Sequence, residues 1–272
     1  MIFKESTIAD LKSGDIGLIG LPFDAHSSFM QGPSEAPECI IEAISSDASN
    51  SFSENLTDLY QHPRIHWLGN AELSSYEAIT KTIQPILAAD ALPFALGGDH
   101  SVSYPILKAM AEKFSNLHIL HFDAHADLYD SLDGNKYSHA CPFARILEEG
   151  LAKNLTQVGI RTLNLHQQQQ AQKFGVTQHT MASTHPLVDF QTEDPVYLSL
   201  DIDVLDPAFA PGVSHHEPGG YSTRELLHMI QSLDLNLVGC DVVEYNPKRD
   251  VNGVTAMVTA KLVKELLVKC LK

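Results

Sequence analysis

The chain is poor in cysteine, in long apolar runs and in positive charge, and each shortage excludes a class of protein. Its 272 residues hold four cysteines and no C-x-x-C pair, so neither a disulfide framework nor a zinc knuckle is expected. No stretch approaches the roughly 18 uninterrupted apolar residues of a membrane span, and no basic stretch leads into an apolar one at residues 1–6. The net charge of −16 argues against binding to nucleic acid or to an anionic membrane. We therefore predict a soluble cytoplasmic protein.

Apolar residues make up 44% of the chain, and short apolar runs alternate with segments of helical periodicity. We expect strands at residues 16–20, 92–96, 117–120, 155–160, 195–200 and 235–243. We expect helices at residues 37–44, 75–89, 101–114, 142–149, 167–174, 222–233 and 252–271. Ser101 and Ser222 are suited to cap the helices that they open, and Glu225 completes a capping box with Ser222. The alternation predicts a parallel sheet with helices on both faces, in one domain over residues 1–272.

The strongest chemical signal is the heptad at residues 121–127, which follows the apolar run at 117–120. Asp123, His125 and Asp127 stand at i, i+2 and i+4, so an extended chain would turn all three to one side. Two carboxylates and an imidazole this close repel each other and desolvate poorly unless a cation lies among them. Taken alone, the heptad also fits an acidic loop after a strand.

Two other predicted strand ends carry the same kinds of side chain. His100 follows strand 92–96, and Asp201 and Asp203 follow strand 195–200. The carboxyl ends of parallel strands form one rim, so these side chains can converge with the heptad. Four carboxylates match the charge of two divalent cations, and an oxygen-rich set favours a hard ion such as Mn²⁺ over one tetrahedral zinc. The sequence predicts a dinuclear site, two Mn²⁺ per chain, made by His100, Asp123, His125, Asp127, Asp201 and Asp203.

Three stretches resemble the signature motifs of the ureohydrolases, the family of arginases and agmatinases. They are Gly-Gly-Asp-His-Ser at 97–101, Asp-Ala-His-Ala-Asp at 123–127 and Ser-Leu-Asp-Ile-Asp-Val-Leu-Asp-Pro-Ala-Phe-Ala-Pro-Gly at 199–212. The likeness continues through residues 217–220 and 241–247 and covers nearly the whole chain. The loops at 27–33 and 134–139 resemble those of plant-type arginases most.

The resemblance implies a three-layer α/β/α fold on a mainly parallel, eight-stranded sheet, and a homotrimer or homohexamer. It implies a binuclear manganese centre whose bridging hydroxide attacks a small cationic guanidino substrate and releases urea. One metal would be held by His100, Asp123, Asp127 and Asp201, and the other by Asp123, His125, Asp201 and Asp203. Asp123 and Asp201 would then bridge the two metals.

The resemblance also implies catalytic roles for three residues. Glu244 would bind the guanidinium, because a planar cation pairs with a carboxylate through two N–H bonds. His139 would bind the substrate and assist the leaving amine, and Asp127 would accept the proton of the nucleophile. Without the resemblance, Glu244 could be a solvated loop acid and His139 a structural histidine.

The substrate is the least determined feature. Animal-type arginases recognise the α-carboxylate with an Asn two residues after the last Asp of the heptad, where this chain has Tyr129. We predict L-arginine, with Asn135 or the loop at 24–31 reading the amino acid, and agmatine as the alternative. Guanidinobutyrase and formimidoylglutamase activities stay open. So do a mononuclear deacetylase-type amidohydrolase and a catalytically silent homologue.

Overall fold

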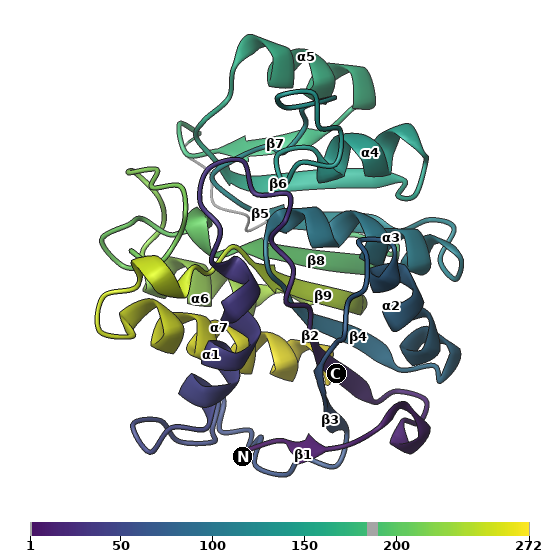
Figure 1. The fold of residues 1–272 in the computed structure, drawn as a ribbon, viewed down its shortest axis with the longest axis vertical. Helices are drawn as coiled ribbons and strands as arrows, with labels where there is room; N and C mark the ends of the chain where they lie inside the picture. Colours follow the sequence, from purple (N-terminus) through teal and green to yellow (C-terminus); the bar gives the residue numbers. More distant parts are fainter. Residues whose placement is uncertain (1, 184–189, 272) are drawn as a thin grey trace.

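The computed structural model describes residues 2–183 and 190–271. It consists of a nine-stranded sheet between two layers of helices (Figure 1). The strands are β1 (Lys4–Glu5), β2 (Ile16–Gly20), β3 (Ile65–Asn70), β4 (Leu92–Leu96), β5 (His118–Phe122), β6 (Asn154–Ile160), β7 (Thr177–Thr180), β8 (Val196–Asp201) and β9 (Leu237–Val243). They pair in the order β1-β3-β2-β4-β9-β8-β5-β6-β7, and each of these pairings is parallel. The expected three-layer α/β/α fold is confirmed.

The sheet has nine strands where eight were expected. The shortest strand, β1, has two residues and pairs with the first residues of β3 at one edge. The other edge strand, β7, has the polar sequence Thr-Gln-His-Thr and no buried residue. Neither edge strand was predicted, because a short polar strand paired on one side only lacks the apolar run that marks a central strand. The more apolar β3 was also missed.

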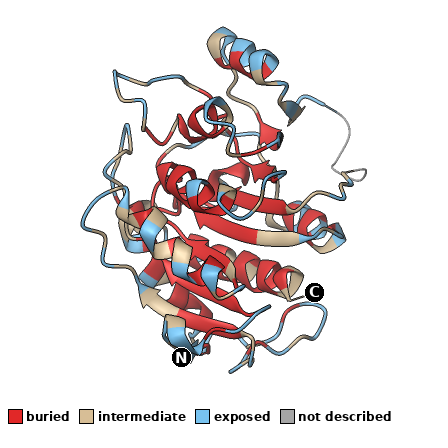
Figure 2. Ribbon diagram, turned by 90° about the vertical axis from the view of Figure 1, so that its right-hand side faces the viewer, coloured by how far each residue is buried: buried red, intermediate tan, exposed pale blue. Residues whose placement is uncertain are grey.

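Helices cover both faces of the sheet. They are α1 (Ala36–Ile44), α2 (Ala78–Ala88), α3 (Ser103–Ala111), α4 (Pro142–Glu148), α5 (Leu165–Phe174), α6 (Thr223–Ser232) and α7 (Val254–Cys270). One core joins α1, α6 and α7 to one face of the sheet, and a second core joins α2, α3 and α4 to the other. Figure 2 shows the strands buried between these layers, while the outward surfaces of the helices are exposed.

One predicted helix cap is confirmed and the other is wrong. Ser222 Oγ accepts a hydrogen bond from the Glu225 N–H (3.2 Å), and Glu225 Oε2 accepts one from the Ser222 N–H (2.8 Å). In contrast, Ser101 lies inside a short 3-10 helix, His100–Val102, which is capped by Asp99 Oδ1 accepting from the Ser101 N–H (3.1 Å). This turn directly after β4 places His100 at the rim of the sheet.

The heptad after β5 is not extended, so the geometric premise of its prediction is wrong. The strand ends at Phe122, and the His125 N–H folds back to donate to Asp123 Oδ1 (2.5 Å). Asp127 has φ +50°, in the left-handed region that few residues other than glycine and Asn or Asp enter. A compact turn, not a pleated strand, gathers the three side chains.

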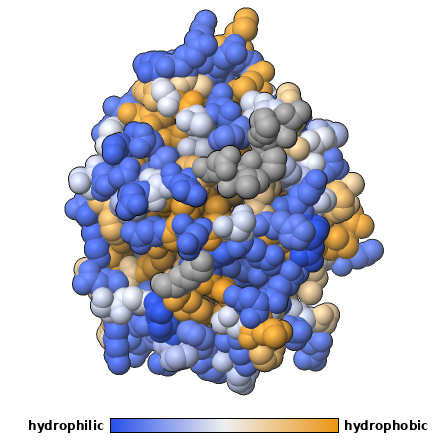
Figure 3. All heavy atoms as spheres, turned by 180° about the vertical axis from the view of Figure 1, so that it is seen from behind, coloured by the Kyte–Doolittle hydropathy of each residue, from blue (hydrophilic) through white to orange (hydrophobic). Residues whose placement is uncertain are grey.

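Within residues 2–183 and 190–271, no helix is long and apolar enough to cross a bilayer. On the face seen in Figure 3, polar side chains predominate and apolar ones lie interspersed among them.

Candidate metal centre and substrate cavity

The candidate site lies where the carboxyl ends of neighbouring strands meet. Strands β4, β9, β8, β5 and β6 are adjacent in the sheet and parallel, so their ends form one rim. Each end contributes polar side chains to this rim, because the chain leaves every strand there in a turn. His100 follows β4, Glu244 follows β9, Asp201 ends β8 with Asp203 just beyond it, and Asp123, His125 and Asp127 follow β5. The structure therefore brings together all six side chains predicted as metal ligands.

The His100 imidazole is fully buried against three of these carboxylates. Its Nδ1 lies 3.1 Å from Asp123 Oδ2, 3.1 Å from Asp127 Oδ2 and 3.3 Å from Asp201 Oδ2. Burial lowers the pKa of His100, but the three carboxylates outweigh burial and hold the pKa well above its ordinary value. The surroundings of Nδ1 therefore favour a positive charge at this point.

A hydrogen-bond chain behind His100 fixes which ring nitrogen faces the carboxylates. The Ser199 hydroxyl donates its only hydrogen to Asp241 Oδ1 (2.6 Å), since a carboxylate oxygen accepts. Its oxygen must then accept from His100 Nε2–H (2.9 Å). In the neutral ring this leaves the lone pair on Nδ1, which is buried and has no aligned hydrogen-bond partner among the described residues. Metal-ligating histidines typically donate a hydrogen bond from the ring nitrogen that does not bind the metal, as His100 does from Nε2.

A second group of ligand atoms adjoins the first and shares Asp123. His125 Nδ1 lies 2.9 Å from Asp203 Oδ2 and 3.4 Å from Asp123 Oδ1. The ligand atoms of Asp123, His125 and Asp203 lie within 4.8 Å of one another, as do those of His100, His121 and Asp123. Two overlapping groups fit two metal ions better than one.

The electrostatics of the cluster also fit a bound cation. Burial raises the pKa of Asp201 well above its ordinary value, and the charges of Asp203 and Asp123 raise it further. Burial likewise raises the pKa of Asp203. Crowded buried carboxylates resist full ionisation when they have only each other as neighbours. Divalent ions among them would remove this cost, so the donor set and its charge both suit a binuclear centre of hard cations.

Glu244 and His139 form an ion pair beside the cluster. Glu244 Oε1 accepts from His139 Nδ1 (2.7 Å) and from the His100 N–H (2.8 Å). Burial raises the pKa of Glu244, but the His139 charge and hydrogen bond outweigh it and the pKa is lowered. Burial lowers the pKa of His139, yet Glu244 raises it overall to about 9. Glu244 also has φ +65°, a conformation that is costly for a glutamate and is found mainly where function requires it.

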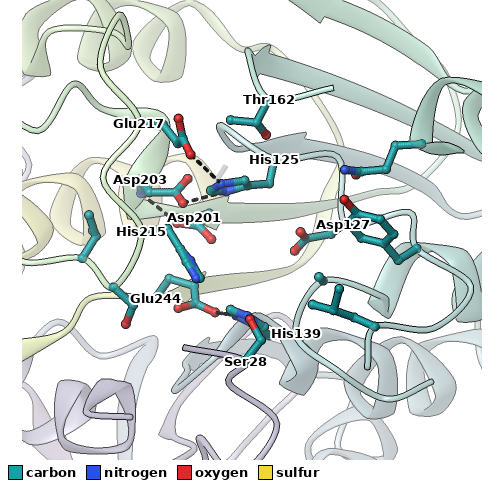
Figure 4. Close-up of a pocket in the computed structure, with 16 residues that line it drawn as sticks. Ser28, His125, Asp127, His139, Thr162, Asp201, Asp203, His215, Glu217 and Glu244 are labelled. Carbon is teal, nitrogen blue, oxygen red and sulfur yellow. Dashed lines mark hydrogen bonds and ion pairs between the residues drawn. The ribbon is translucent and has the colours of Figure 1, made fainter. Parts of the chain in front are cut away.

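These groups line a cavity of about 320 Å³ (Figure 4). Six of the residues with predicted metal or catalytic roles line it, namely His125, Asp127, His139, Asp201, Asp203 and Glu244, whereas His100 and Asp123 lie behind its surface. Asn135 is not among the residues that line the cavity, and its Oδ1 accepts from the Tyr137 N–H (2.9 Å) within the loop. A contact between Asn135 and substrate therefore stays a prediction.

Sequence reasoning passed over several residues of this site. His121 is fully buried, and its Nε2 lies 2.8 Å from Asp123 Oδ2. The heptad's i, i+2 spacing could have found it, since His121 stands two residues before Asp123. Ser28 Oγ contacts His139 Nε2 (2.8 Å), and this contact comes from the loop at 24–31 that was singled out without a role for Ser28. His215 lines the cavity with an Nε2 that has no hydrogen-bond partner among the described residues.

The fold and the site together define an α/β/α protein with a candidate metal cluster at the carboxyl ends of parallel strands. The Arginase family model matches residues 14–269. The chain is 45% identical to arginase 1, mitochondrial, of Arabidopsis thaliana over 94% of this chain and 81% of the relative. The solved arginase from Medicago truncatula superposes with a TM-score of 0.90 at 42% identity, over 96% of this chain and 88% of that one. The chain belongs to the arginase family.

A second relative has a different printed activity. An agmatinase of Bacillus cereus is 37% identical over 75% of this chain and 72% of the relative. The plant arginases thus match at higher identity and over more of the chain, which agrees with the predicted resemblance to plant-type arginases.

The prediction of a cytoplasmic protein is wrong. The similar arginases of Arabidopsis thaliana, Medicago truncatula and rice are all named mitochondrial. Cysteine usage separates oxidising from reducing surroundings but does not separate one reducing compartment from another. Targeting segments are read by import receptors and not by the fold, so the core of a protein carries no signal of its compartment.

Proposed function

We propose that this chain is a manganese-dependent arginase that hydrolyses L-arginine to L-ornithine and urea, with residues 1–272 as one catalytic domain. The observation that carries the proposal is the position of the Glu244 carboxylate, which faces the same cavity as the carboxylate–histidine cluster. The 45% identity to a plant arginase favours L-arginine as the substrate. A homotrimer or homohexamer remains the predicted assembly, and light scattering would test it.

The cluster at the strand ends would hold two Mn²⁺. His100, Asp123, Asp127 and Asp201 would hold one ion, and Asp123, His125, Asp201 and Asp203 the other. Bound metal would neutralise the carboxylates and lower the pKa of water, which supplies the nucleophile. The oxygen-rich donor set supports Mn²⁺ over zinc.

Glu244 would orient the substrate. Its Oε1 already accepts from His139 and from the His100 N–H, so the carboxylate is held in one orientation before substrate arrives. Its Oε2 has no described partner and can accept from an N–H of a guanidinium. A lowered pKa keeps Glu244 ionised at neutral pH, as the pairing with a permanently charged guanidinium requires.

Asp127 and His139 would move protons. When water adds to the guanidinium carbon, Asp127 would take a proton from it, since its carboxylate lies in the cavity next to His100. The bond from that carbon to the substrate's side-chain nitrogen then breaks, and the nitrogen needs a proton to leave as an amine. His139 would supply it, because a pKa of about 9 keeps its ring protonated at neutral pH. As the carbonyl of urea forms, Asp127 would pass its proton to the released amine, and the hydroxyl proton would leave to solvent, which restores the proton of His139.

Agmatinase is the second candidate, and Tyr129 is the observation that favours it. Tyr129 lines the cavity at the position where animal-type arginases carry the Asn that reads the α-carboxylate. Agmatine has no such carboxylate, so a site without a reader would accept it.

Urea release by the manganese-saturated protein tests the proposal. L-arginine, agmatine and 4-guanidinobutyrate would be compared at equal concentrations, before and after removal of metal with a chelator. We expect L-arginine to be hydrolysed fastest, and we expect chelation to abolish urea release until Mn²⁺ is restored. An agmatine preference would replace the proposed substrate. Release from none of the three compounds would overturn the ureohydrolase function.

A further inference from the structure

The wall of the cavity that follows β6 contains polar groups that the proposed chemistry does not use. Figure 4 shows Thr162, which follows β6, across the cavity from Glu244 and Ser28. Gln167 on α5 and Tyr129 line the same cavity. A substrate held at its guanidinium end by Glu244 extends away from Glu244, so its other end meets groups on another wall.

The side chain of Gln167 is buried, and no described residue forms a hydrogen bond with its amide. The residue is 3% exposed and lines the cavity, and its Oε1 has no hydrogen-bond partner among the described residues. The side chain forms no hydrogen bond that the structure shows, and only its backbone N–H is engaged, donating to Asn164 Oδ1 (2.9 Å). Buried amides are almost always satisfied in native proteins, so the orphaned Oε1 calls for an N–H donor such as an ammonium, and Nε2 is left to donate to an acceptor.

Asn164 fixes the hydrogen-bonding roles of its neighbour Tyr129. Its Oδ1 caps α5 by accepting from the Gln167 N–H, so its Nδ2 is the atom that faces Tyr129 Oη (2.5 Å). The phenolic oxygen is therefore the acceptor in that bond, and the Tyr129 hydrogen is left free to donate. Gln167 and Tyr129 thus offer uncommitted N–H and O–H donors on one wall of the cavity.

The surroundings show what these donors suit. Asp127, Asp201, Asp203, Glu217 and Glu244 all line the cavity, so an anionic group on a substrate would be repelled wherever no donor meets it. Gln167 lies in the first turn of α5, where the positive end of the helix dipole favours a carboxylate. A side-chain amide can donate to a carboxylate and accept from an ammonium, which are the two groups at the α-carbon of an amino acid.

We infer that Gln167, assisted by the Tyr129 hydroxyl, binds the α-carboxylate of the substrate and makes this site select an amino acid over the corresponding decarboxylated amine. The inference rests on the proposed function, since it names the group that reads the far end of L-arginine. Asn164 acts as a positioning residue that holds both readers. Although Tyr129 replaces the Asn of the animal-type enzymes, the α-carboxylate still has hydrogen-bond donors in this site.

A matched control lies on the same helix. Gln170 is also a buried glutamine, 7% exposed, and its Nε2 also lacks a hydrogen-bond partner among the described residues. It does not line the cavity. Gln170→Ala therefore measures the general effect on ligand binding of removing a buried amide from α5. Gln167→Ala measures the same effect together with the loss of the proposed carboxylate-binding amide.

The test measures binding of L-ornithine and putrescine, which differ by one carboxylate, to the manganese-saturated protein by calorimetry. We expect Gln167→Ala to lower the affinity for L-ornithine about tenfold or more, as loss of a hydrogen bond to a charged group does. The affinity for putrescine should change less than about twofold. Gln170→Ala should leave both ligands unchanged. Steady-state kinetics should show a raised KM for L-arginine with little change in kcat.

Two further variants keep the test decisive if Gln167→Ala does not fold. Gln167→Glu keeps the size of the side chain and adds a negative charge that repels the α-carboxylate. The affinity for L-ornithine should therefore fall further, while putrescine should bind as tightly or better. Tyr129→Phe removes one hydroxyl and should weaken L-ornithine about threefold to tenfold. Equal weakening of both ligands in these variants, or no weakening of L-ornithine, would overturn the inference while leaving the arginase function intact if the wild type still releases urea from L-arginine. A wild type that hydrolyses no guanidino compound would overturn the proposed function itself.

Discussion

The two walls of the cavity are built in different ways. The first, which we call the metal wall, consists of Glu244 and the six predicted metal ligands. These polar side chains stand at the ends of buried strands, and His100 has further partners behind it in Ser199 and Asp241. On the wall that follows β6, Gln167 has no side-chain partner among the described residues and the Tyr129 hydroxyl keeps a free donor. The first wall is already arranged for its ligands, while the second leaves its hydrogen-bonding capacity for the substrate. On the proposed function, the chemistry would lie on the rigid sheet, and substrate choice on a loop and the first turn of a helix.

The largest effect should come from removing a carboxylate of the metal wall. Asp201→Ala deletes a ligand that both metals would share, so we expect the protein to lose bound Mn²⁺ and kcat/KM for L-arginine to fall at least about 1,000-fold. Metal analysis of the dialysed protein and urea release would measure the two losses. Asp130→Asn, an exposed carboxylate in the loop after the heptad, should change neither. Full metal content in Asp201→Ala would contradict the assignment.

A smaller loss should follow when the substrate ligand is changed and the metal ligands are kept. Glu244→Gln preserves size but removes the charge that pairs with the guanidinium, and we expect kcat/KM to fall about 100-fold to 1,000-fold. Bound manganese should remain at the wild-type level, because Glu244 is not a proposed metal ligand. Wild-type kinetics in Glu244→Gln would show that another group binds the guanidinium.

Removing the hydrogen bond that orients His100 should lower the affinity for manganese, although no metal ligand is deleted. Ser199→Ala takes away the acceptor of His100 Nε2–H, and we expect manganese affinity to drop about tenfold to 100-fold. Ser103→Ala is the control, because Ser103 also donates to Asp241 (2.7 Å), whereas the described hydrogen-bond partner of His100 Nε2 is Ser199. Equal losses in both variants would assign the effect to Asp241 and not to the orientation of His100.

The smallest effect should come from a residue far from both walls. Ser222→Ala removes the cap of α6 and should lower the free energy of unfolding by about 1 kcal/mol. Denaturant unfolding would measure this loss, and kcat and KM should stay at their wild-type values. A change in kinetics would mean that α6 is coupled to the site.

The difference between the walls also decides what the sequence could predict. The ligands of the metal wall follow the ends of apolar strands, so the convergence of His100, Asp123 and Asp201 could be inferred from the amino-acid sequence alone. The conformation of the heptad could not, because Asp127 has a left-handed φ and contacts His100 from another strand end, and the i, i+2 spacing encodes neither feature. The central strands were found by their apolar runs, whereas β1 and β7 lacked that signal.

The second wall was beyond sequence reasoning for a physical reason. Gln167 opens a run of four glutamines, and nothing in the run separates the residue that faces the cavity from its neighbours. Only the helix start fixed by Asn164 decides that Gln167 lines the cavity while Gln170 does not. Asn135 was the more obvious candidate by residue type, yet its side-chain oxygen is used within its own loop.

The most direct test of the central claim is the number of metal ions that the metal wall binds. Chelator-stripped protein would be titrated with Mn²⁺ in a calorimeter, with His100→Ala and His125→Ala titrated alongside. The account predicts two equivalents for the wild type and one tight equivalent for each variant, since each histidine would serve one ion. A single equivalent in the wild type would contradict the binuclear centre and favour a mononuclear amidohydrolase.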